Sequence, residues 1–482
     1  MTSQAWINLA YLAASMLFIV AFKLMSGPRT AVRGNFFGAA GMGLAILAAC
    51  FDPAVTSAVA SRGAWPLLLV GLAAAIGGGI GATMALRYPM TGMPQMVALL
   101  NGFGGAASAL VAGAELASTV AASAGEEPAV AALANLQPWT QFGIATAITG
   151  LIGGLTLFGS LVAFGKLEEL PQFKKAWTDP RRHWINAGLA ALVAVLVWAV
   201  CAGPERQFFF WLLVAVGCTL GCTLTLPIGG ADMPVVICLL NSYSGLAAAA
   251  AGFVIDNVVL VIAGSLVGAS GLILTAIMCQ AMNRSLVGVL FGGLGTGPAV
   301  ADDDVYAGKI KSAGAEEIAM VLEGADRVVI VPGYGLAVAQ AQHAVRELAD
   351  VLLQRGCEVE YAIHPVAGRM PGHMNVLLAE ADVPYEQLRE MDDINPSFAE
   401  TDVAIVIGAN DVVNPAARTD PTSPIAGMPV LDVDKARTVV VVKRSLSPGF
   451  AGIPNPLFAA DNTLMYFADG KKAVLDLTAA LA

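Results

Sequence analysis

The sequence is poor in charged residues and almost devoid of histidine. Only 13% of its 482 residues are Asp, Glu, Lys or Arg, 57% are hydrophobic, and four are His. A soluble globular domain carries about 25% charged residues, so this composition indicates a protein of the lipid bilayer. The net charge is −10. No basic stripe is available to neutralise phosphates, which argues against nucleic acid as a partner.

Paired cysteines are also missing. The chain has seven cysteines, and those in or beside apolar runs show no repeated paired spacing: Cys50, Cys201, Cys218, Cys222 and Cys238. We interpret them as small packing residues, because a disulfide framework needs regular pairs. Cys218 and Cys222 stand one helical turn apart and could in principle hold a metal. No other ligand clusters with them, so we expect no metal site.

The apolar N-terminus does not have the form of a cleaved leader. It lacks a charged n-region, and no clean cleavage site precedes Lys23. We therefore expect this segment to be retained as a first membrane span.

Charge is distributed unevenly along the chain. Residues 1–284 hold 12 of the 26 basic residues and 10 of the 36 acidic ones, a net charge of +2. Residues 285–482 hold the other 14 basic and 26 acidic residues, a net charge of −12. We expect a transmembrane domain at 1–284, a linker at 285–312 rich in glycine and aspartate, and a soluble domain at 313–482.

Roughly nine stretches are apolar over the ~20 residues that a bilayer requires. They lie near 5–25, 34–52, 64–86, 93–117, 139–164, 184–203, 207–226, 234–253 and 257–282. If the spans alternate, most basic residues fall on one side: Lys23, Arg29, Arg33, Arg87, Lys166, Lys174, Lys175, Arg181, Arg182 and Arg284. Only Arg62 and Arg206 fall on the other. The positive-inside rule then predicts an outer N-terminus and a cytoplasmic C-terminal domain, as in a multi-pass protein of the bacterial inner membrane.

The membrane part contains an internal repeat. Residues 93–107, with Met93-Pro94 and Asn101, recur 140 positions later as residues 233–247, with Met233-Pro234 and Asn241. Both copies open a span from the cytoplasmic side. We interpret the halves as parallel copies related by an axis near the membrane normal.

Four polar residues of this part are candidates for a proton path. Asn101 and Asn241 lie about 12 Å into their helices at ~1.5 Å per residue. Polar groups at such depth line a pathway or tie helices together, and we favour the pathway. Asp232 at the cytoplasmic mouth and Arg284 beside the linker could relay to the soluble domain. Both could also be ordinary interfacial charges.

Beyond residue 312, apolar strands alternate with helical patterns. We expect strands at 328–331, 359–363, 403–407, 429–433, 438–442 and 463–467, and a longest helix at 336–353. This alternation predicts a Rossmann-like, doubly wound α/β domain.

Two turns of this domain carry glycine after a strand. Gly333 and Gly335 lie between an expected strand and an expected helix, where glycines let backbone N–H groups meet a pyrophosphate. A third glycine is missing, so a purely structural turn is the alternative. Residues 408–417 follow another strand. There, Asn410, Asp411 and Asn414 can cap a helix or bind ribose and carboxamide groups.

Two features predict selectivity for a phosphorylated nucleotide: a missing acid after the second strand and a basic cluster after a later one. The second strand ends without the acid that holds a ribose 2′-hydroxyl in NAD-selective sites. Lys443, Arg444 and Ser445 follow a later strand, and two cations with a hydroxyl suit a 2′-phosphate. The alternative is a solvated basic strand end.

These features together resemble the beta subunit of proton-translocating NAD(P) transhydrogenases. The resemblance covers essentially the whole chain and is carried by the spans and by residues 239–245, 331–335, 364–375, 408–417 and 443–445. It implies an NADP(H) site formed by Gly333, Tyr334, Gly335, Leu336, Ala337, Val366, Ala367, Gly368, Arg369, Gly408, Ala409, Asn410, Asp411, Lys443, Arg444 and Ser445. Gly449, Phe450 and Ala451 are similar to the family's loop that folds over the nucleotide.

The resemblance also implies an activity and partners. It implies hydride transfer from NADH to NADP⁺ coupled to inward proton translocation, an alpha subunit of one chain or two that binds NAD(H) and adds membrane helices, and a dimer of alpha-beta units. Hydride transfer between nicotinamides needs positioning at about 3–3.5 Å and no catalytic side chain. We therefore expect no catalytic triad.

One position departs from the family pattern. Some members have histidine where this chain has Asn101, which cannot titrate, so the proton must use ordered water or a group from a partner helix. Two other functions remain open at this point. One is a transporter or channel gated by an NADP(H)-sensing domain. The other is an oxidoreductase that passes electrons to haem or quinone, which the lack of histidine deep in a span disfavours.

Overall fold

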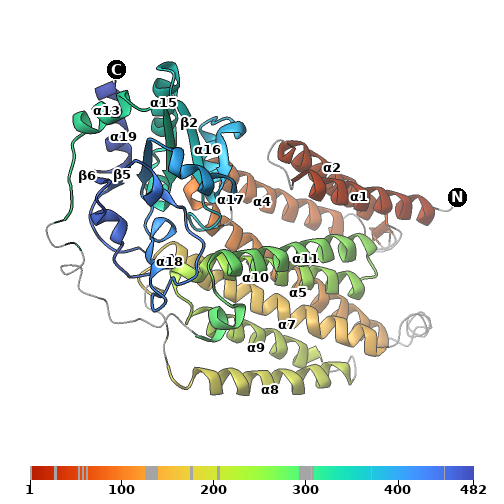
Figure 1. The fold of residues 1–482 in the computed structure, drawn as a ribbon. Coiled ribbons are helices and arrows are strands. Elements are labelled where there is room, and N and C mark those ends of the chain that lie inside the picture. Colours follow the sequence, from red (N-terminus) through yellow and green to blue (C-terminus); the bar gives the residue numbers. More distant parts are fainter. Residues whose placement is uncertain are drawn as a thin grey trace. The chain divides into compact units, whose positions relative to one another are not determined.

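The chain forms two compact units in the computed structural model (Figure 1). The first comprises Met1–Pro227 and Cys238–Ile273, and the second comprises Ile228–Ile237 and Leu274–Ala482. The structure describes residues 3–25, 30–52, 55–56, 59–60, 63, 65–124, 139–173, 177, 179–202, 207–292, 306, 309–370, 372–449 and 451–481. Most of the expected linker and Phe450 lie outside these residues.

Long apolar helices account for the first unit. They are α1 (Ser3–Met25), α2 (Ala31–Cys50), α4 (Trp65–Arg87), α5 (Met93–Ala124), α7 (Trp139–Leu167), α8 (Arg182–Cys201), α9 (Gln207–Thr225), α10 (Met233–Val254) and α11 (Val258–Ala281). Within the described residues, nine helices are long and apolar enough to cross a membrane. This confirms the expected spans. A helix satisfies its own backbone groups, as a bilayer requires.

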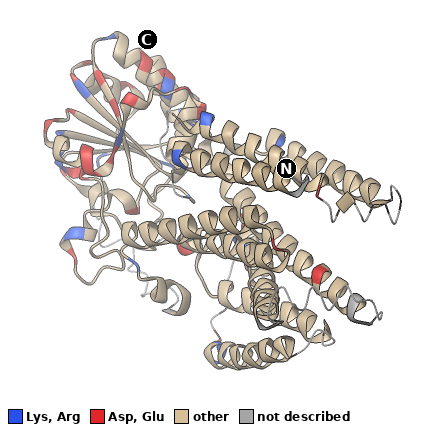
Figure 2. Ribbon diagram, turned by 90° about the vertical axis from the view of Figure 1, so that its right-hand side faces the viewer, with Lys and Arg blue, Asp and Glu red and all other residues tan. Residues whose placement is uncertain are grey.

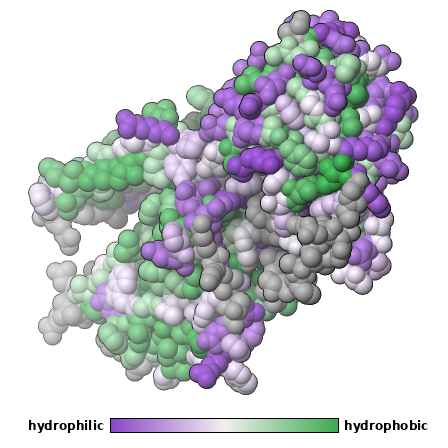
Figure 3. Space-filling view, turned by 90° about the vertical axis from the view of Figure 1, so that its left-hand side faces the viewer, coloured by the Kyte–Doolittle hydropathy of each residue, from purple (hydrophilic) through white to green (hydrophobic). Residues whose placement is uncertain are grey.

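Charge and hydropathy separate along the chain as the composition predicts. Figure 2 shows acidic and basic residues concentrated on the elements of the C-terminal part, whereas the long helices carry very few. Figure 3 shows hydrophobic surface along the helices and hydrophilic surface over the sheet-containing part.

Small residues let the helices of the first unit pack closely. A Cβ at Gly105 of α5 would stand 2.7 Å from the carbonyl oxygen of Gly153 in α7. A Cβ at Gly217 of α9 would stand 2.6 Å from the carbonyl oxygen of Leu151, also in α7. Lipid supplies little hydrophobic drive between helices, so such close backbone approach is what holds them together.

The structure bears out the internal repeat. A 3₁₀ turn, η1 (Met90–Gly92), precedes α5, and a second turn, η3 (Gly230–Asp232), precedes α10 at the same 140-residue offset. A Cβ at Gly104 would stand 2.5 Å from the hydroxyl of Ser244, the residue at the equivalent position of the second copy.

A parallel six-stranded sheet forms the centre of the second unit. Its order is β3-β2-β1-β4-β5-β6, with β1 (Arg327–Pro332), β2 (Glu358–Ile363), β3 (Leu388–Glu390), β4 (Val403–Ile407), β5 (Thr438–Lys443) and β6 (Thr463–Phe467). The helices are α13 (Ala315–Glu323), α14 (Tyr334–Ala339), α15 (Gln342–Gln354), α16 (His373–Glu380), α17 (Met391–Ile394), α18 (Ala416–Thr419) and α19 (Gly470–Leu481). Central strands such as β4 are buried along their whole length, which explains their unbroken apolar sequence. The doubly wound α/β fold is confirmed.

Two expectations for this unit were wrong, and one strand was missed. The helix expected at 336–353 is two helices, because Gln340 adopts a left-handed conformation at φ 48° and ψ 45° and ends α14. Residues 429–433 form no strand and lead into the 3₁₀ turn Val433–Lys435. The short edge strand β3 was not expected, because three residues, of which Arg389 and Glu390 are exposed, give no periodic signal.

Candidate functional site

The glycine turn at Gly333 and the one at Gly408 meet between β1 and β4, where the order of strands in the sheet reverses. β1 and β4 are neighbours, and ligands of doubly wound sheets bind beyond the carboxyl ends of such strands. A Cβ at Gly333 would stand 2.5 Å from Cα of Ala409, and one at Gly335 would stand 2.6 Å from Cα of Gly408. Gly408 itself has φ +65°. Only glycine fits this backbone-on-backbone contact, and the turns at both strand ends are locked together.

The start of α14 contributes an aromatic ring and an apolar anchor. The guanidinium carbon of Arg369 lies 4.6 Å from the ring centroid of Tyr334, a cation–π contact that holds both side chains at the site. Leu336 and Ala337 are fully buried. They fix the helix against the core, whereas Tyr334 at its first position is only half-buried.

Two histidines fix the loop that follows β2. Nδ1 of His364 accepts the N–H of Val366 at 3.2 Å, and its Nε2 donates to the carbonyl oxygen of Pro429 at 2.8 Å. Nδ1 of His373 accepts the N–H of Arg369 at 3.1 Å. Burial lowers the pKa of His364 to about 4, against the opposing hydrogen bond to Pro429. Burial, with the Arg369 cation, likewise lowers the pKa of His373 to about 4.

Both rings are therefore neutral at pH 7, and each holds the loop by hydrogen bonds. The loop between them contains buried Ala367 and Gly368, whose φ of +108° favours glycine. The sequence did not predict this role for either histidine. The available signal was the position of two of the four histidines on either side of Val366–Arg369.

Asp411 joins the β4 turn to a later loop. Its Oδ2 accepts the N–H of Ala451 at 3.0 Å, and a Cβ at Gly449 would stand 2.7 Å from its Cγ. With the Asn410 amide turned so that its oxygen faces donors, that oxygen accepts from the N–H of Gly449 at 2.6 Å and Nζ of Lys443 at 3.3 Å. The loop that begins at Gly449 therefore lies against the β4 turn.

The basic cluster stands at the carboxyl end of β5, next to β4. Nζ of Lys443 donates to the carbonyl oxygen of Ser447 at 2.8 Å and lies 4.7 Å from the ring centroid of Phe458. The Ser445 and Ser447 hydroxyls are 2.9 Å apart. Arg444 is exposed. The structure thus brings the cluster to the same edge of the sheet as the glycine turns.

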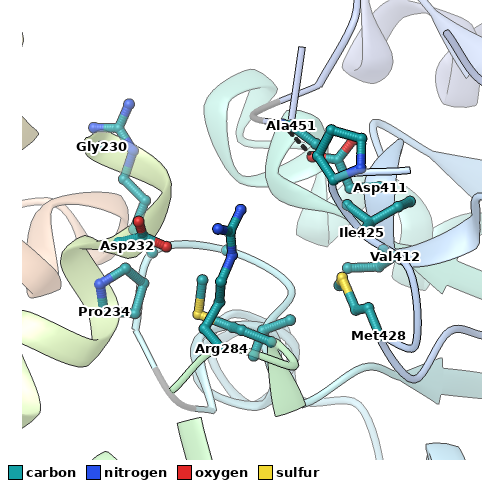
Figure 4. A pocket seen from close by; sticks show the side chains of 14 residues that line it. Gly230, Asp232, Pro234, Arg284, Asp411, Val412, Ile425, Met428 and Ala451 are labelled. Atoms are coloured by element: carbon teal, nitrogen blue, oxygen red, sulfur yellow. Dashed lines mark hydrogen bonds between the residues drawn. The ribbon is translucent and has the colours of Figure 1, made fainter. Parts of the chain in front are cut away.

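A cavity of about 90 Å³ in the second unit brings two groups of candidates together. Asp232 and Arg284 line it, with Arg369 and Asp411 on its other walls. Figure 4 shows Asp232 and Arg284 facing the space opposite Asp411, which is bonded to Ala451. Burial raises the pKa of Asp232, and the nearby Arg284 cation opposes that rise. The cavity has charged side chains set in mainly apolar walls, and it is large enough for several water molecules.

The two asparagines are not at this cavity. Asn101 in α5 is 8% exposed, and Asn241 in α10 is half-buried; both belong to the first unit. Sequence reasoning missed a further polar group there. Ser160 in α7 is fully buried, and its Cβ lies 3.1 Å from where a Cβ of Gly102 in α5 would stand.

The described residues contain no group of three or more His, Cys, Asp and Glu side chains that could hold a metal ion. A site built from glycine turns, the exposed Arg444 and a loop that carries Arg369 suits an anionic dinucleotide.

Comparison with known proteins gives one consistent family. The family model for the NAD(P) transhydrogenase beta subunit matches residues 7–480. Two relatives, from Rhodospirillum rubrum and from a named strain of that species, are called NAD(P) transhydrogenase subunit beta. Each is 48% identical to this chain over 474 residues, which cover 98% of the chain and 98% of the relative.

Proposed function

Because the chain belongs to the NAD(P) transhydrogenase beta-subunit family, we propose that its C-terminal domain, residues 313–482, binds NADP(H). We propose further that this domain exchanges hydride with NAD(H) held by an alpha subunit, while the transmembrane domain at 1–284 moves protons inward. A beta subunit implies an alpha subunit as partner. The proposed assembly is a dimer of alpha-beta units in the bacterial inner membrane, with the N-terminus outside and the C-terminal domain in the cytoplasm.

The observation that carries the nucleotide proposal is the contact between the two glycine turns. Gly333, Gly335 and Gly408 leave no room for a Cβ, so the turns after β1 and β4 lie in direct backbone contact. Glycine turns at this place in a dinucleotide fold are where a pyrophosphate meets the backbone N–H groups. Tyr334, Arg369 and Asp411 surround this point, and Ala451 covers Asp411. The residues present fit a dinucleotide along this edge.

The phosphate selectivity rests on the two strand ends beside the turns. β2 is followed by buried, neutral His364 and offers no acid for a 2′-hydroxyl at its end. β5 ends in Lys443, Arg444 and Ser445, and a planar guanidinium with five donors suits a phosphate. These are the groups that we assign to the 2′-phosphate of NADP(H).

The chemistry places modest demands on the protein. The bound nicotinamide supplies the hydride donor or acceptor, so this chain only has to hold the ring at about 3–3.5 Å from its partner ring and exclude water. NADH and NADPH differ by a remote phosphate, which leaves little intrinsic driving force. An inward proton contributes about 2.3 kcal/mol per 100 mV, roughly a fiftyfold shift in the product ratio at 1.4 kcal/mol per tenfold.

The proposed proton path uses Asn101 and Asn241 in the helices and Asp232 and Arg284 at the cavity. Its support is the depth of the two asparagines and the burial of Asp232 beside the residues assigned to the nucleotide. Coupling of the two sites is reciprocal, so nucleotide state must also change proton affinity.

The nucleotide assignment is tested by Arg444→Ala in the assembled complex. Removing a charge-assisted contact to phosphate should raise KM for NADP(H) about tenfold, or ~1.4 kcal/mol, with KM for NAD(H) unchanged. Arg437→Ala is the matched control, because Arg437 stands at the other end of β5, 80% exposed and paired with Asp402. An unchanged KM for NADP(H) in Arg444→Ala rules out the phosphate role.

The rival function is a transporter or channel gated by an NADP(H)-sensing domain. It would bind the same nucleotide and transfer no hydride. Membranes that contain this chain and its alpha subunit should reduce an acetylpyridine analogue of NAD⁺ with NADPH, and absence of that reduction would favour the rival.

A further inference from the structure

We propose that Tyr306 is a positioning residue for NADP(H), which ties the segment between the last membrane helix and the α/β fold to the loop that covers the nucleotide. The proposal rests on the proposed NADP(H) site. Tyr306 belongs to the stretch between the turn Gly288–Gly292 and α13. Most of the expected linker lies in this stretch, and the sequence predicted no role for Tyr306 at the nucleotide site.

Tyr306 is built into the core of the second unit. It is 6% exposed and packs among buried residues of β1, β4 and β5. Its ring stacks on Phe458 with centroids 6.4 Å apart and planes 21° apart. Its hydroxyl accepts the backbone N–H of Asn455 at 2.7 Å. The hydroxyl therefore fixes the end of the loop that begins at Gly449.

Asn455 carries this contact on to the β4 turn. It is fully buried, and its Nδ2 donates to the carbonyl oxygen of Asn410 at 3.1 Å. Its Oδ1 accepts the N–H of Leu457 at 3.0 Å and so caps the turn Pro456–Ala459. Asn410 is followed by Asp411, which holds the other part of the loop through Ala451. Tyr306 is thus two hydrogen bonds away from the glycine turn.

The ring of Tyr306 reaches the basic cluster by a second route. Phe458, on which it stacks, lies beneath the ammonium group of Lys443. One side chain of the connecting stretch therefore supports both the loop over the nucleotide and the cation assigned to its phosphate. Removal of the hydroxyl should therefore release the loop over the nucleotide, while the stacking on Phe458 beneath Lys443 stays in place.

The experiment compares Tyr306→Phe with Tyr361→Phe in the assembled alpha-beta complex. Tyr361 is a matched control: it is also buried, it lies in β2, and its hydroxyl has no hydrogen-bond partner among the described residues. Tyr306→Phe should raise KM for NADP(H) and the rate of NADPH release about fivefold, the effect of one ordinary hydrogen bond. KM for NAD(H) and the thermal midpoint should stay within the range of Tyr361→Phe.

Two outcomes overturn the proposal. One is an unchanged KM for NADP(H) and an unchanged NADPH release rate in a Tyr306→Phe complex that folds and assembles. The other is an equal rise of KM for both nucleotides, because a general loss of packing would affect them alike. Failure of the proposed function looks different, since the unaltered complex would then show no preference for NADP(H) over NAD(H).

Discussion

The two copies of the internal repeat have matching residues in unlike surroundings. In the second copy, Gly217 and Gly221 of α9 press against the backbone of α7. Their counterparts 140 positions earlier are Gly77 and Gly81 of α4, and a Cβ at either would meet nothing within 4 Å in the described structure. The same spacing of glycines thus makes a tight helix contact in one copy and meets no described residue of this chain in the other.

The copies also differ at the helix entrance. The last residue of η3 is Asp232, which is 3% exposed, and the equivalent last residue of η1 is Gly92. The backbone repeats while the titratable group occurs in one copy. The glycines are thus conserved between the copies but pack differently, whereas the carboxyl group at the helix entrance is present in the second copy only.

The strongest way to break this comparison is to fill the glycine contact of α9. Gly221→Val should destabilise the first unit by about 3 kcal/mol or more, because a side chain there must displace the backbone of α7. Yield and thermal midpoint of the detergent-solubilised complex measure the effect. Gly81→Val, the same change at the equivalent position, should lie within about 0.5 kcal/mol of the unaltered chain. A similar loss in both variants would show that α4 is also packed.

A second prediction concerns the titratable group found in one copy only. Asp232→Asn should lower proton-coupled turnover about a hundredfold, the usual contribution of a positioned acid or base. Asp256→Asn is the control, because Asp256 is an exposed carboxyl just beyond the opposite end of α10 with φ 51°, which asparagine tolerates. Burial raises the pKa of Asp232, so the group protonates above the usual aspartate range as pH falls. The acid limb of the turnover profile should disappear in Asp232→Asn, and its persistence would exclude this group from the path.

Much of this architecture could be predicted from the sequence because strong periodic signals dominate it. Runs of about 20 apolar residues fix the spans, and buried strands such as β4 and β5 are unbroken runs of apolar residues. The repeat was visible because Met-Pro and Asn recur at one offset. The break at Gln340 was not, since a left-handed residue other than glycine leaves no mark in an otherwise helical pattern.

The candidate site likewise has a part that the sequence predicts and a part that it does not. Gly333, Gly408 and the Lys443 cluster each follow a strand, so their placement at one edge of the sheet follows from topology. The contacts of Tyr306 and Asn455 could not be inferred, because they join residues 149 positions apart in the sequence. The roles of His364 and His373 were missed because a neutral, buried histidine is recognised only when its environment is known.

The smallest expected effect compares the two asparagines themselves. Leucine has the same branched arrangement of four side-chain heavy atoms as asparagine but is larger and cannot hydrogen-bond, so Asn101→Leu should lower proton-coupled turnover about tenfold, or ~1.4 kcal/mol. Asn241→Leu should cost about threefold, ~0.7 kcal/mol, because Asn241 is half-buried and Asn101 is 8% exposed. Proton uptake by vesicles during NADPH oxidation measures both. A larger effect at Asn241 would mean that the second copy holds the narrower part of the path, and that burial in one chain is a poor guide to where the proton is gated.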